Sequence, residues 1–216
     1  MAEARDQVED FYFFQSPIYK ISKKDFLESV STVADESVAV DCEQNINSLH
    51  PVCMSGNFAE DPRIDEFATY VLGTAWNILE SQGYAIDNYD LTYTSMWMQE
   101  HHKNSSMNQH VHGEGNQIIA FYFLKVPEDG CHLMIHDPRP GKLQVNLQEI
   151  DPANVTLGSR TVVIRPEEGD LIFTNAWLPH SFSKNGSEEA TKFVHINIAA
   201  YPGKTRACKT PQAEVV

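Results

Sequence analysis

Residues 109–115 of the chain have the sequence QHVHGEG, and about 70 residues later residues 177–181 have the sequence WLPHS. In an extended strand, side chains at positions i and i+2 leave the same face, so His110 and His112 can point at one ion. His180 can supply a third imidazole. Neutral imidazole binds iron, zinc, copper and nickel, and an open three-ligand site leaves coordination positions free for substrate or dioxygen. The two stretches therefore predict a catalytic metal site shared between two strands.

The second part of the chain favours a β barrel around this site. From residue 91 onward, short runs rich in β-branched and aromatic residues alternate with turns that contain Pro, Gly, Asp or Asn. Seven short strands of this kind fit a sandwich or jelly roll. We expect them at residues 91–98, 117–126, 133–136, 143–147, 161–164, 170–174 and 193–201.

The first part of the chain is predicted to be mainly helical. Residues 23–33 have apolar residues at helical spacing, and a second helix starts at Asp61-Pro62 and ends at Gly83. The aromatic residues 11–14 suggest a short buried strand. We expect one domain over residues 1–203, with a helical part at 1–90, a barrel at 91–203, and a disordered tail at 204–216.

Composition excludes several classes of protein. The formal charge of −14 and the isoelectric point near 4.9 argue against nucleic acid as a partner. No apolar run approaches the ~20 residues of a membrane helix, and the acidic first residues do not resemble a secretory signal, so we expect a cytoplasmic protein. The four cysteines show no paired spacing and are expected to be free thiols: Cys42, Cys53, Cys131 and Cys208.

Several motifs occur in an order that resembles a known family. After the His-x-His pair come FYFL at 121–124, IHDPR at 135–139, GDLIF at 169–173 and WLPH at 177–180. In this order they resemble the iron(II)/2-oxoglutarate-dependent oxygenases, in particular an uncharacterised branch found in bacteria and marine phages. The resemblance implies a mainly β fold with flanking helices, a double-stranded β-helix of the jelly-roll or cupin-like type, with Fe(II) and 2-oxoglutarate as cofactors. A phage-encoded member would work in the host cytoplasm.

The ligand set departs from the usual pattern of this superfamily, in which the first motif is His-x-Asp or His-x-Glu. Three sets are open: the three histidines, His112 with Glu114 and His180, or a set completed by Asp137. Glu114 stands between two glycines, where backbone freedom makes exact placement of a ligand costly. We favour His110, His112 and His180, with Asp137 as the reserve ligand.

The resemblance also implies contacts for the cosubstrate. A basic residue on the strand after the last histidine usually binds its distal carboxylate, and Lys192 stands twelve residues after His180. Arg139 is a competing candidate, while Tyr122 and Asn197 can donate hydrogen bonds to the same carboxylate or to the metal ligands. Trp177 is expected to line a substrate pocket. The other histidines, among them His101, His136 and His195, are expected at the surface or with satisfied hydrogen bonds.

The function implied is oxidation of a small molecule or a protein side chain, most simply a hydroxylation, coupled to conversion of 2-oxoglutarate to succinate and CO2. The acidic surface favours a neutral or basic substrate. One alternative is a cupin-type metalloprotein that holds zinc or iron without 2-oxoglutarate, for which a basic residue at position 192 has no use. Another is a catalytically silent barrel with a structural or interaction role.

Overall fold

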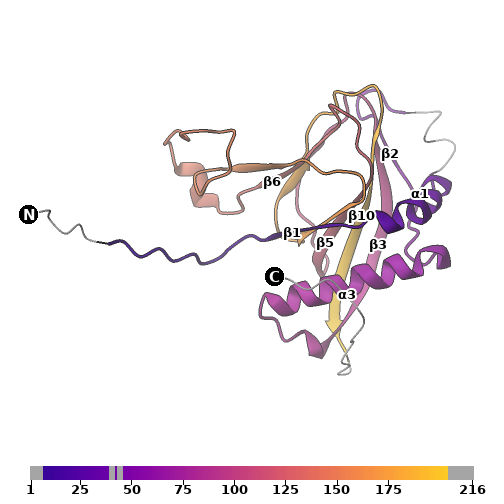
Figure 1. Ribbon diagram of the computed structural model, residues 1–216, viewed down its shortest axis with the longest axis horizontal. Helices are drawn as coiled ribbons and strands as arrows, with labels where there is room; N and C mark the ends of the chain where they lie inside the picture. The colour runs from indigo at the N-terminus through magenta and orange to yellow at the C-terminus, as the bar shows by residue number, and fades with distance from the viewer. Residues whose placement is uncertain (1–6, 39–41, 43–45, 204–216) are drawn as a thin grey trace, which may run out of the picture.

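The strands form two antiparallel sheets that lie face to face (Figure 1). The computed structural model describes residues 7–38, 42 and 46–203. The larger sheet has the order β1-β8-β5-β10-β3-β2, and the smaller one has the order β4-β9-β6-β7. Strand bounds are β1 Ile18–Ser22, β2 Val52–Met54, β3 Tyr89–His101, β4 Met107–His110, β5 Asn116–Lys125, β6 Leu133–His136, β7 Thr161–Ile164, β8 Asp170–Asn175, β9 His180–Phe182 and β10 Thr191–Pro202. This mainly β layout with flanking helices confirms the predicted fold class.

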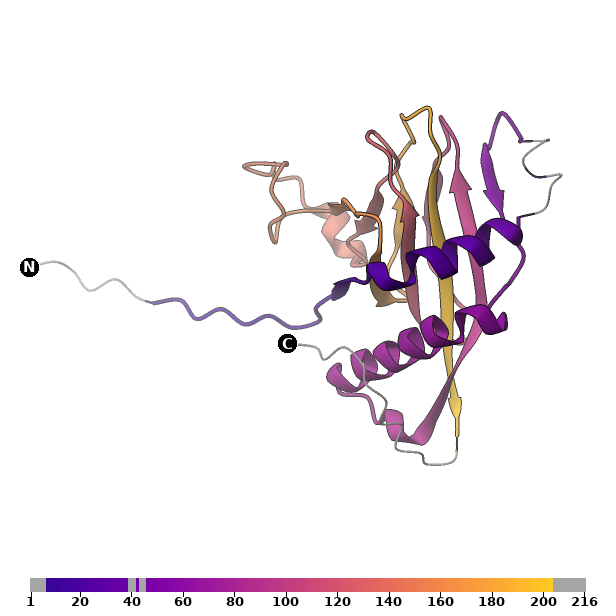
Figure 2. The ribbon, with the colours of Figure 1, turned by 45° about the vertical axis from the view of Figure 1, so that its right-hand side comes forward.

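Two helices cover the outer face of the larger sheet, as Figure 2 shows. They are α1 (Leu27–Glu36) and α3 (Asp65–Ser81), accompanied by the 3-10 turns η1 (Lys24–Phe26), η2 (Pro62–Ile64), η3 (Ile86–Asn88) and η4 (Pro140–Gln144). The Asp61 side chain accepts a hydrogen bond from the Arg63 N–H before α3, and Gly83 adopts a φ of +90° after it. The predicted cap and terminator are therefore both present. Within the described residues, no helix has the length and apolarity needed to cross a bilayer.

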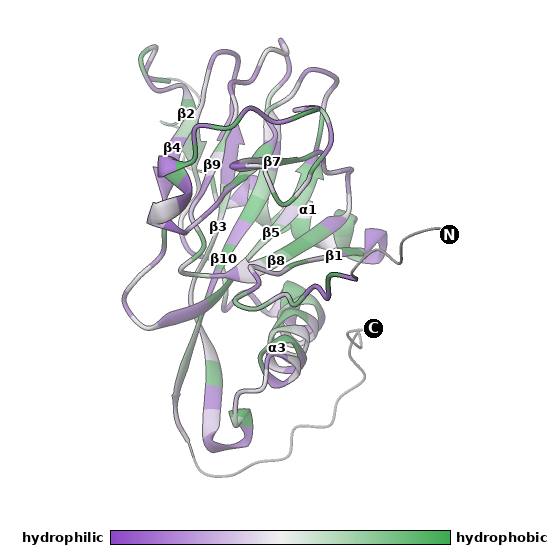
Figure 3. Cartoon of the chain, turned by 90° about the vertical axis from the view of Figure 1, so that its left-hand side faces the viewer, coloured by the Kyte–Doolittle hydropathy of each residue, from purple (hydrophilic) through white to green (hydrophobic). Residues whose placement is uncertain are grey.

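The larger sheet separates two apolar cores, because successive side chains of a strand leave opposite faces. Its central strands carry mostly hydrophobic residues (Figure 3). Even-numbered residues of β5 and β10 pack toward α1 and α3: Ile118, Ala120, Tyr122, Leu124, Val194, Ile196 and Ile198. Odd-numbered residues pack into the space between the two sheets, which we call the lumen: Ile119, Phe121, Phe123 and Phe193, against Leu133, Ile135 and Phe182. Whether a residue of these strands is odd- or even-numbered thus decides whether its side chain can reach a site inside the barrel.

Two strand predictions were wrong. Residues 11–14 form no strand, and Phe14 is 96% exposed with a φ of +58°. The strand in this region is β1, which starts just after Pro17 and pairs with β8. Residues 143–147 also form no strand, because they belong to the long excursion between β6 and β7 and have no neighbouring strand to pair with. The predicted tail at 204–216 lies outside the described residues.

The expectation of free thiols was wrong for two cysteines. Cys42 and Cys53 form a disulfide with a Cα–Cα distance of 5.7 Å, and among the described cysteines Cys131 is the free, buried thiol. Pairing of β2 with the end of β3 fixes the position of Cys53. Because residues 36–61 have no regular apolar period, the sequence could not indicate that the chain returns to bring Cys42 beside it.

Replacement of Phe67 by Ala should lower the free energy of unfolding by about 3–5 kcal/mol, since the ring is fully buried against Phe26 and Tyr122. The matched change Phe14→Ala should alter it by less than about 0.5 kcal/mol, since that ring is exposed. Denaturant unfolding followed by circular dichroism measures both. An equal loss of unfolding free energy in both variants would contradict the placement of Phe67 in the core.

Alkylation of the denatured protein without reductant should modify Cys131 and leave Cys42 and Cys53 unmodified, as peptide mass spectrometry can show. After reduction all three should react. Full modification of Cys42 and Cys53 before reduction would show that the disulfide is absent.

Candidate metal centre

Three histidines meet at one end of the smaller sheet. His110 ends β4 and lies directly opposite His180, the first residue of β9, in the antiparallel register. His112 follows two residues after His110, and its backbone N–H donates to the carbonyl of Ala176 at 2.9 Å. One ligand nitrogen from each ring lies within 4.8 Å of the other two. The strand pairing and one backbone hydrogen bond therefore bring together the three histidines that the sequence singled out.

The ring orientations leave one nitrogen of His110 and of His180 available. Nδ1 of His110 is 2.8 Å from the carbonyl oxygen of Asn108, and Nδ1 of His180 is 3.1 Å from that of Leu178. A carbonyl only accepts hydrogen bonds, so both Nδ1 atoms carry the proton and both Nε2 atoms carry a lone pair. Nε2 of His180 and Nε2 of His112 are buried without a hydrogen-bond partner. Buried imidazole nitrogens without a hydrogen-bond partner are atoms that a metal ion could bind.

The surroundings keep the imidazoles of His112 and His180 uncharged. Burial, with a minor contribution from neighbouring histidines, lowers the pKa of His180 to about 3. Burial and the nearby His110 lower the pKa of His112 to about 4, against a small opposing effect of Asn197. Metal coordination needs neutral imidazole, so neither of these two rings has to lose a proton near pH 7 before it binds an ion. The donor set therefore fits a divalent ion such as Fe(II), Ni(II) or Zn(II).

Neither carboxylate considered in the sequence joins this group. Glu114 is exposed, in a turn with a φ of +59°. Asp137 is bound by the Arg139 guanidinium, with 2.6 Å between Oδ2 and Nη2, and Arg139 lowers its pKa. Within the part of the chain that the structure describes, the ligand group consists of the three histidines alone.

Two residues suggested as cosubstrate contacts lie on the helix side of the larger sheet. Lys192 is an even-numbered residue of β10, and its Nζ is 3.0 Å from Asp35 of α1 and 3.6 Å from Glu100. Tyr122 packs in the helix-side core, where its hydroxyl donates to the carbonyl of Lys23 at 2.8 Å. The sheet itself separates both side chains from the histidines.

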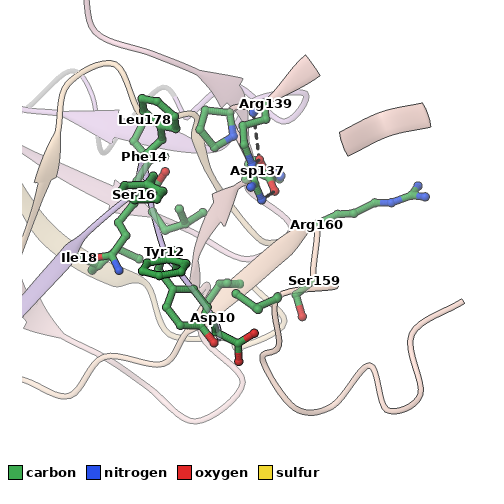
Figure 4. A pocket seen from close by; sticks show the side chains of 18 residues that line it. Asp10, Tyr12, Phe14, Ser16, Ile18, Asp137, Arg139, Ser159, Arg160 and Leu178 are labelled. Atoms are coloured by element: carbon green, nitrogen blue, oxygen red, sulfur yellow. Dashed lines mark hydrogen bonds and ion pairs between the residues drawn. The ribbon is translucent and has the colours of Figure 1, made fainter. Parts of the chain in front are cut away.

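Arg139 and Asp137 instead line an open cavity of about 600 Å³ at the barrel edge (Figure 4). The aromatic residues 11–14 form one wall, and Ile135 and Leu178 form the part nearest the lumen. Ile135 lies opposite His180 in the pairing of β6 with β9, so this wall adjoins the histidine cluster. Trp177 is 46% exposed and does not line this cavity.

The lumen contains further polar residues that the sequence reasoning missed. His195 is 1% exposed, and its ring centroid is 4.6 Å from that of His112. Gln99 lies between His195 and His101, which is also fully buried. Asn197, predicted near the site, is buried on the same strand and donates to the Ser95 hydroxyl. Residues 193, 195 and 197 are odd-numbered positions of one strand, so their side chains leave the same face. This spacing was the signal that could have placed His195 inside the barrel.

Comparison with known families and structures gives a consistent result. Residues 95–195 match the family model described as "Putative 2OG-Fe(II) oxygenase", a range that contains all three clustered histidines. No curated protein matches the chain in sequence.

Three solved structures share the fold. A Pseudomonas putida prolyl-4-hydroxylase aligns over 84% of this chain and 92% of its own, with 11% identity and a TM-score of 0.55. The viral collagen prolyl hydroxylase of Paramecium bursaria Chlorella virus-1, in a 2-oxoglutarate complex, aligns over 84% and 94%, with 13% identity and a TM-score of 0.54. HygX from Streptomyces hygroscopicus, with nickel, 2-oxoglutarate and hygromycin B bound, aligns over 85% and 83%, with 12% identity and a TM-score of 0.53. At such identities the likeness establishes the double-stranded β-helix.

Replacement of His180 by Ala should weaken Ni(II) or Co(II) binding by more than about 100-fold, because loss of a ligand costs more than the 10- to 100-fold of an outer contact. The matched control is His136→Ala, whose ring bonds the Ser181 hydroxyl at 2.8 Å outside the ligand group. Isothermal titration calorimetry should give one ion per wild-type chain and per His136→Ala chain. An equal loss of metal affinity in His180→Ala and His136→Ala would contradict the assignment of His180 as a ligand.

Proposed function

We propose that this chain is a 2OG-Fe(II) oxygenase, an oxidoreductase that uses Fe(II) and 2-oxoglutarate, and that His110, His112 and His180 hold the iron. The observation that carries this proposal is the group of three nitrogens within 4.8 Å, two of them buried and without a partner. We further propose that the enzyme hydroxylates a small molecule or a protein side chain.

The backbone carbonyls of Asn108 and Leu178 would orient two of the three ligands. Each carbonyl accepts a hydrogen bond from the Nδ1–H of its histidine, and this bond fixes both the tautomer and the rotation of the ring. The site therefore does not have to reorganise its imidazoles when the ion binds. Bound Fe(II) would supply the activation of dioxygen, with 2-oxoglutarate as the source of two electrons.

Aromatic side chains would exclude water from the inner side of the site. The ring of Phe121 meets His180 edge to face, at 5.4 Å between centroids, and Phe121 and Phe182 are both buried in the lumen. Exclusion of water from this wall strengthens electrostatic interactions at the ion and limits side reactions with water.

A ligand set of three neutral imidazoles gives the ion no protein charge to offset its own. With a carboxylate in the set, one of the two positive charges would be compensated. Here both remain, so the site should attract an anionic chelator such as the 2-oxo acid group more strongly. The departure from the usual triad is thus compatible with binding of the cosubstrate.

The cavity lined by residues 11–14, Ile135 and Leu178 supports a place for the substrate, because its inner wall adjoins β9 and His180. Its aromatic wall suits an apolar or aromatic group. The formal charge of −14 favours a substrate that is neutral or basic.

Anaerobic addition of 2-oxoglutarate to the Fe(II)-loaded protein should produce the weak visible charge-transfer band of an iron-oxoacid chelate, and admission of air should yield succinate. His180→Ala should show neither, while His136→Ala should show both. Iron binding without band or succinate would overturn the proposal in favour of a cupin-type metalloprotein. Failure to bind iron at all would favour a barrel without catalysis.

A further inference from the structure

His195 offers a hydrogen-bond donor that no described residue of the chain uses. Its Nδ1 is 3.3 Å from Nε2 of the Gln99 amide, and the other end of that amide, Oε1, is 3.1 Å from Nε2 of His101. An amide nitrogen only donates, so Nδ1 of His195 accepts and the ring proton lies on Nε2. Nε2 of His195 is buried and has no partner.

This donor lies beside the histidine cluster. The His195 ring stacks on Trp97 at 4.4 Å between centroids and contacts Phe121 at 4.7 Å. Among the described residues, its ring also contacts the imidazoles of His112, at 4.6 Å between centroids, and His180, at 6.1 Å. A buried N–H without an acceptor is destabilising, so an acceptor delivered by a ligand would remove this penalty.

The described part of the chain places no buried lysine or arginine in the lumen to meet a carboxylate. Among the described residues, no lysine or arginine is buried. Lys192, the basic residue of β10, is held on the helix side by Asp35 and Glu100. The buried polar residues described on the lumen side of β10 are Thr191, His195 and Asn197.

We propose that the Nε2–H of His195 donates a hydrogen bond to a carboxylate of 2-oxoglutarate, a contact that needs no buried lysine or arginine. The inference rests on the proposed function, since it names the residue that recognises the cosubstrate at the same metal centre. Gln99 acts as a positioning residue: it contacts no ligand and instead fixes the tautomer of His195 through Nδ1.

The test measures 2-oxoglutarate affinity of the Ni(II)-loaded protein by isothermal titration calorimetry, which reports binding without turnover. His195→Phe keeps a flat ring between Trp97 and Phe121 but removes the donor. We expect about 10- to 100-fold weaker binding, the range for loss of a hydrogen bond to a charged group. His195→Gln, which retains an N–H donor, should recover most of this loss. Nickel affinity should be unchanged in both variants.

Lys192→Met is the matched control, since it removes the basic side chain of the same strand from the opposite face. It should change 2-oxoglutarate affinity by less than about 2-fold. A tenfold loss in Lys192→Met with none in His195→Phe would overturn the inference and leave the proposed function standing. Absence of 2-oxoglutarate binding in the nickel-loaded wild type would overturn both.

A double-mutant cycle tests the role of Gln99. Gln99→Leu alone should weaken 2-oxoglutarate binding about 3- to 10-fold, because His195 loses its fixed tautomer. In the His195→Phe background the same change should have no further effect. An equal loss in both backgrounds would show that Gln99 does not act through His195.

Discussion

The candidate site depends on the pairing of β4 with β9, which puts His110 directly opposite His180. A shift of one residue in either strand would turn one of these histidines away from the other. The backbone hydrogen bond from His112 to Ala176 then holds the third histidine on the turn that follows β4. Because the register comes from backbone hydrogen bonds, the three nitrogens are assembled before any ion is present. This preorganisation lowers the cost of binding the metal.

The neutrality of the site is its main chemical property. Burial lowers the pKa of His112, His180 and His195, so near pH 7 these lumen imidazoles are uncharged. A bound divalent ion would carry the charge of the site, and anionic ligands would be attracted to it rather than to a basic side chain. The basic residue of β10, Lys192, instead pairs with acidic residues between the sheet and α1. The two faces of β10 thus have different roles. Its even-numbered residues pack against the helices, and its odd-numbered residues line the site.

Much of the fold followed from local sequence patterns. The cap at Asp61, the end of α3 near Gly83, and the strands at 161–164 and 170–174 all depend on nearby residues, and the structure has them close to the predicted positions. The sequence also singled out His110, His112 and His180, because an i, i+2 pair is visible without knowledge of the fold. Other features depend on contacts between distant segments. The Cys42–Cys53 disulfide, the exposure of residues 11–14 and the burial of His195 follow from which strands pair and which face each strand turns inward. The placement of Lys192 outside the lumen could have been inferred from its parity with Val194 and Ile196, given the register of β10.

A crystal structure of the Ni(II)-loaded protein, with the ion located by its anomalous scattering, would show directly which residues hold the metal. We expect one ion about 2.1 Å from Nε2 of His110, His112 and His180, with no protein carboxylate bound to it. A metal–oxygen bond to Asp137 or Glu114, or an ion held away from these three rings, would show that the three histidines are not the ligand set.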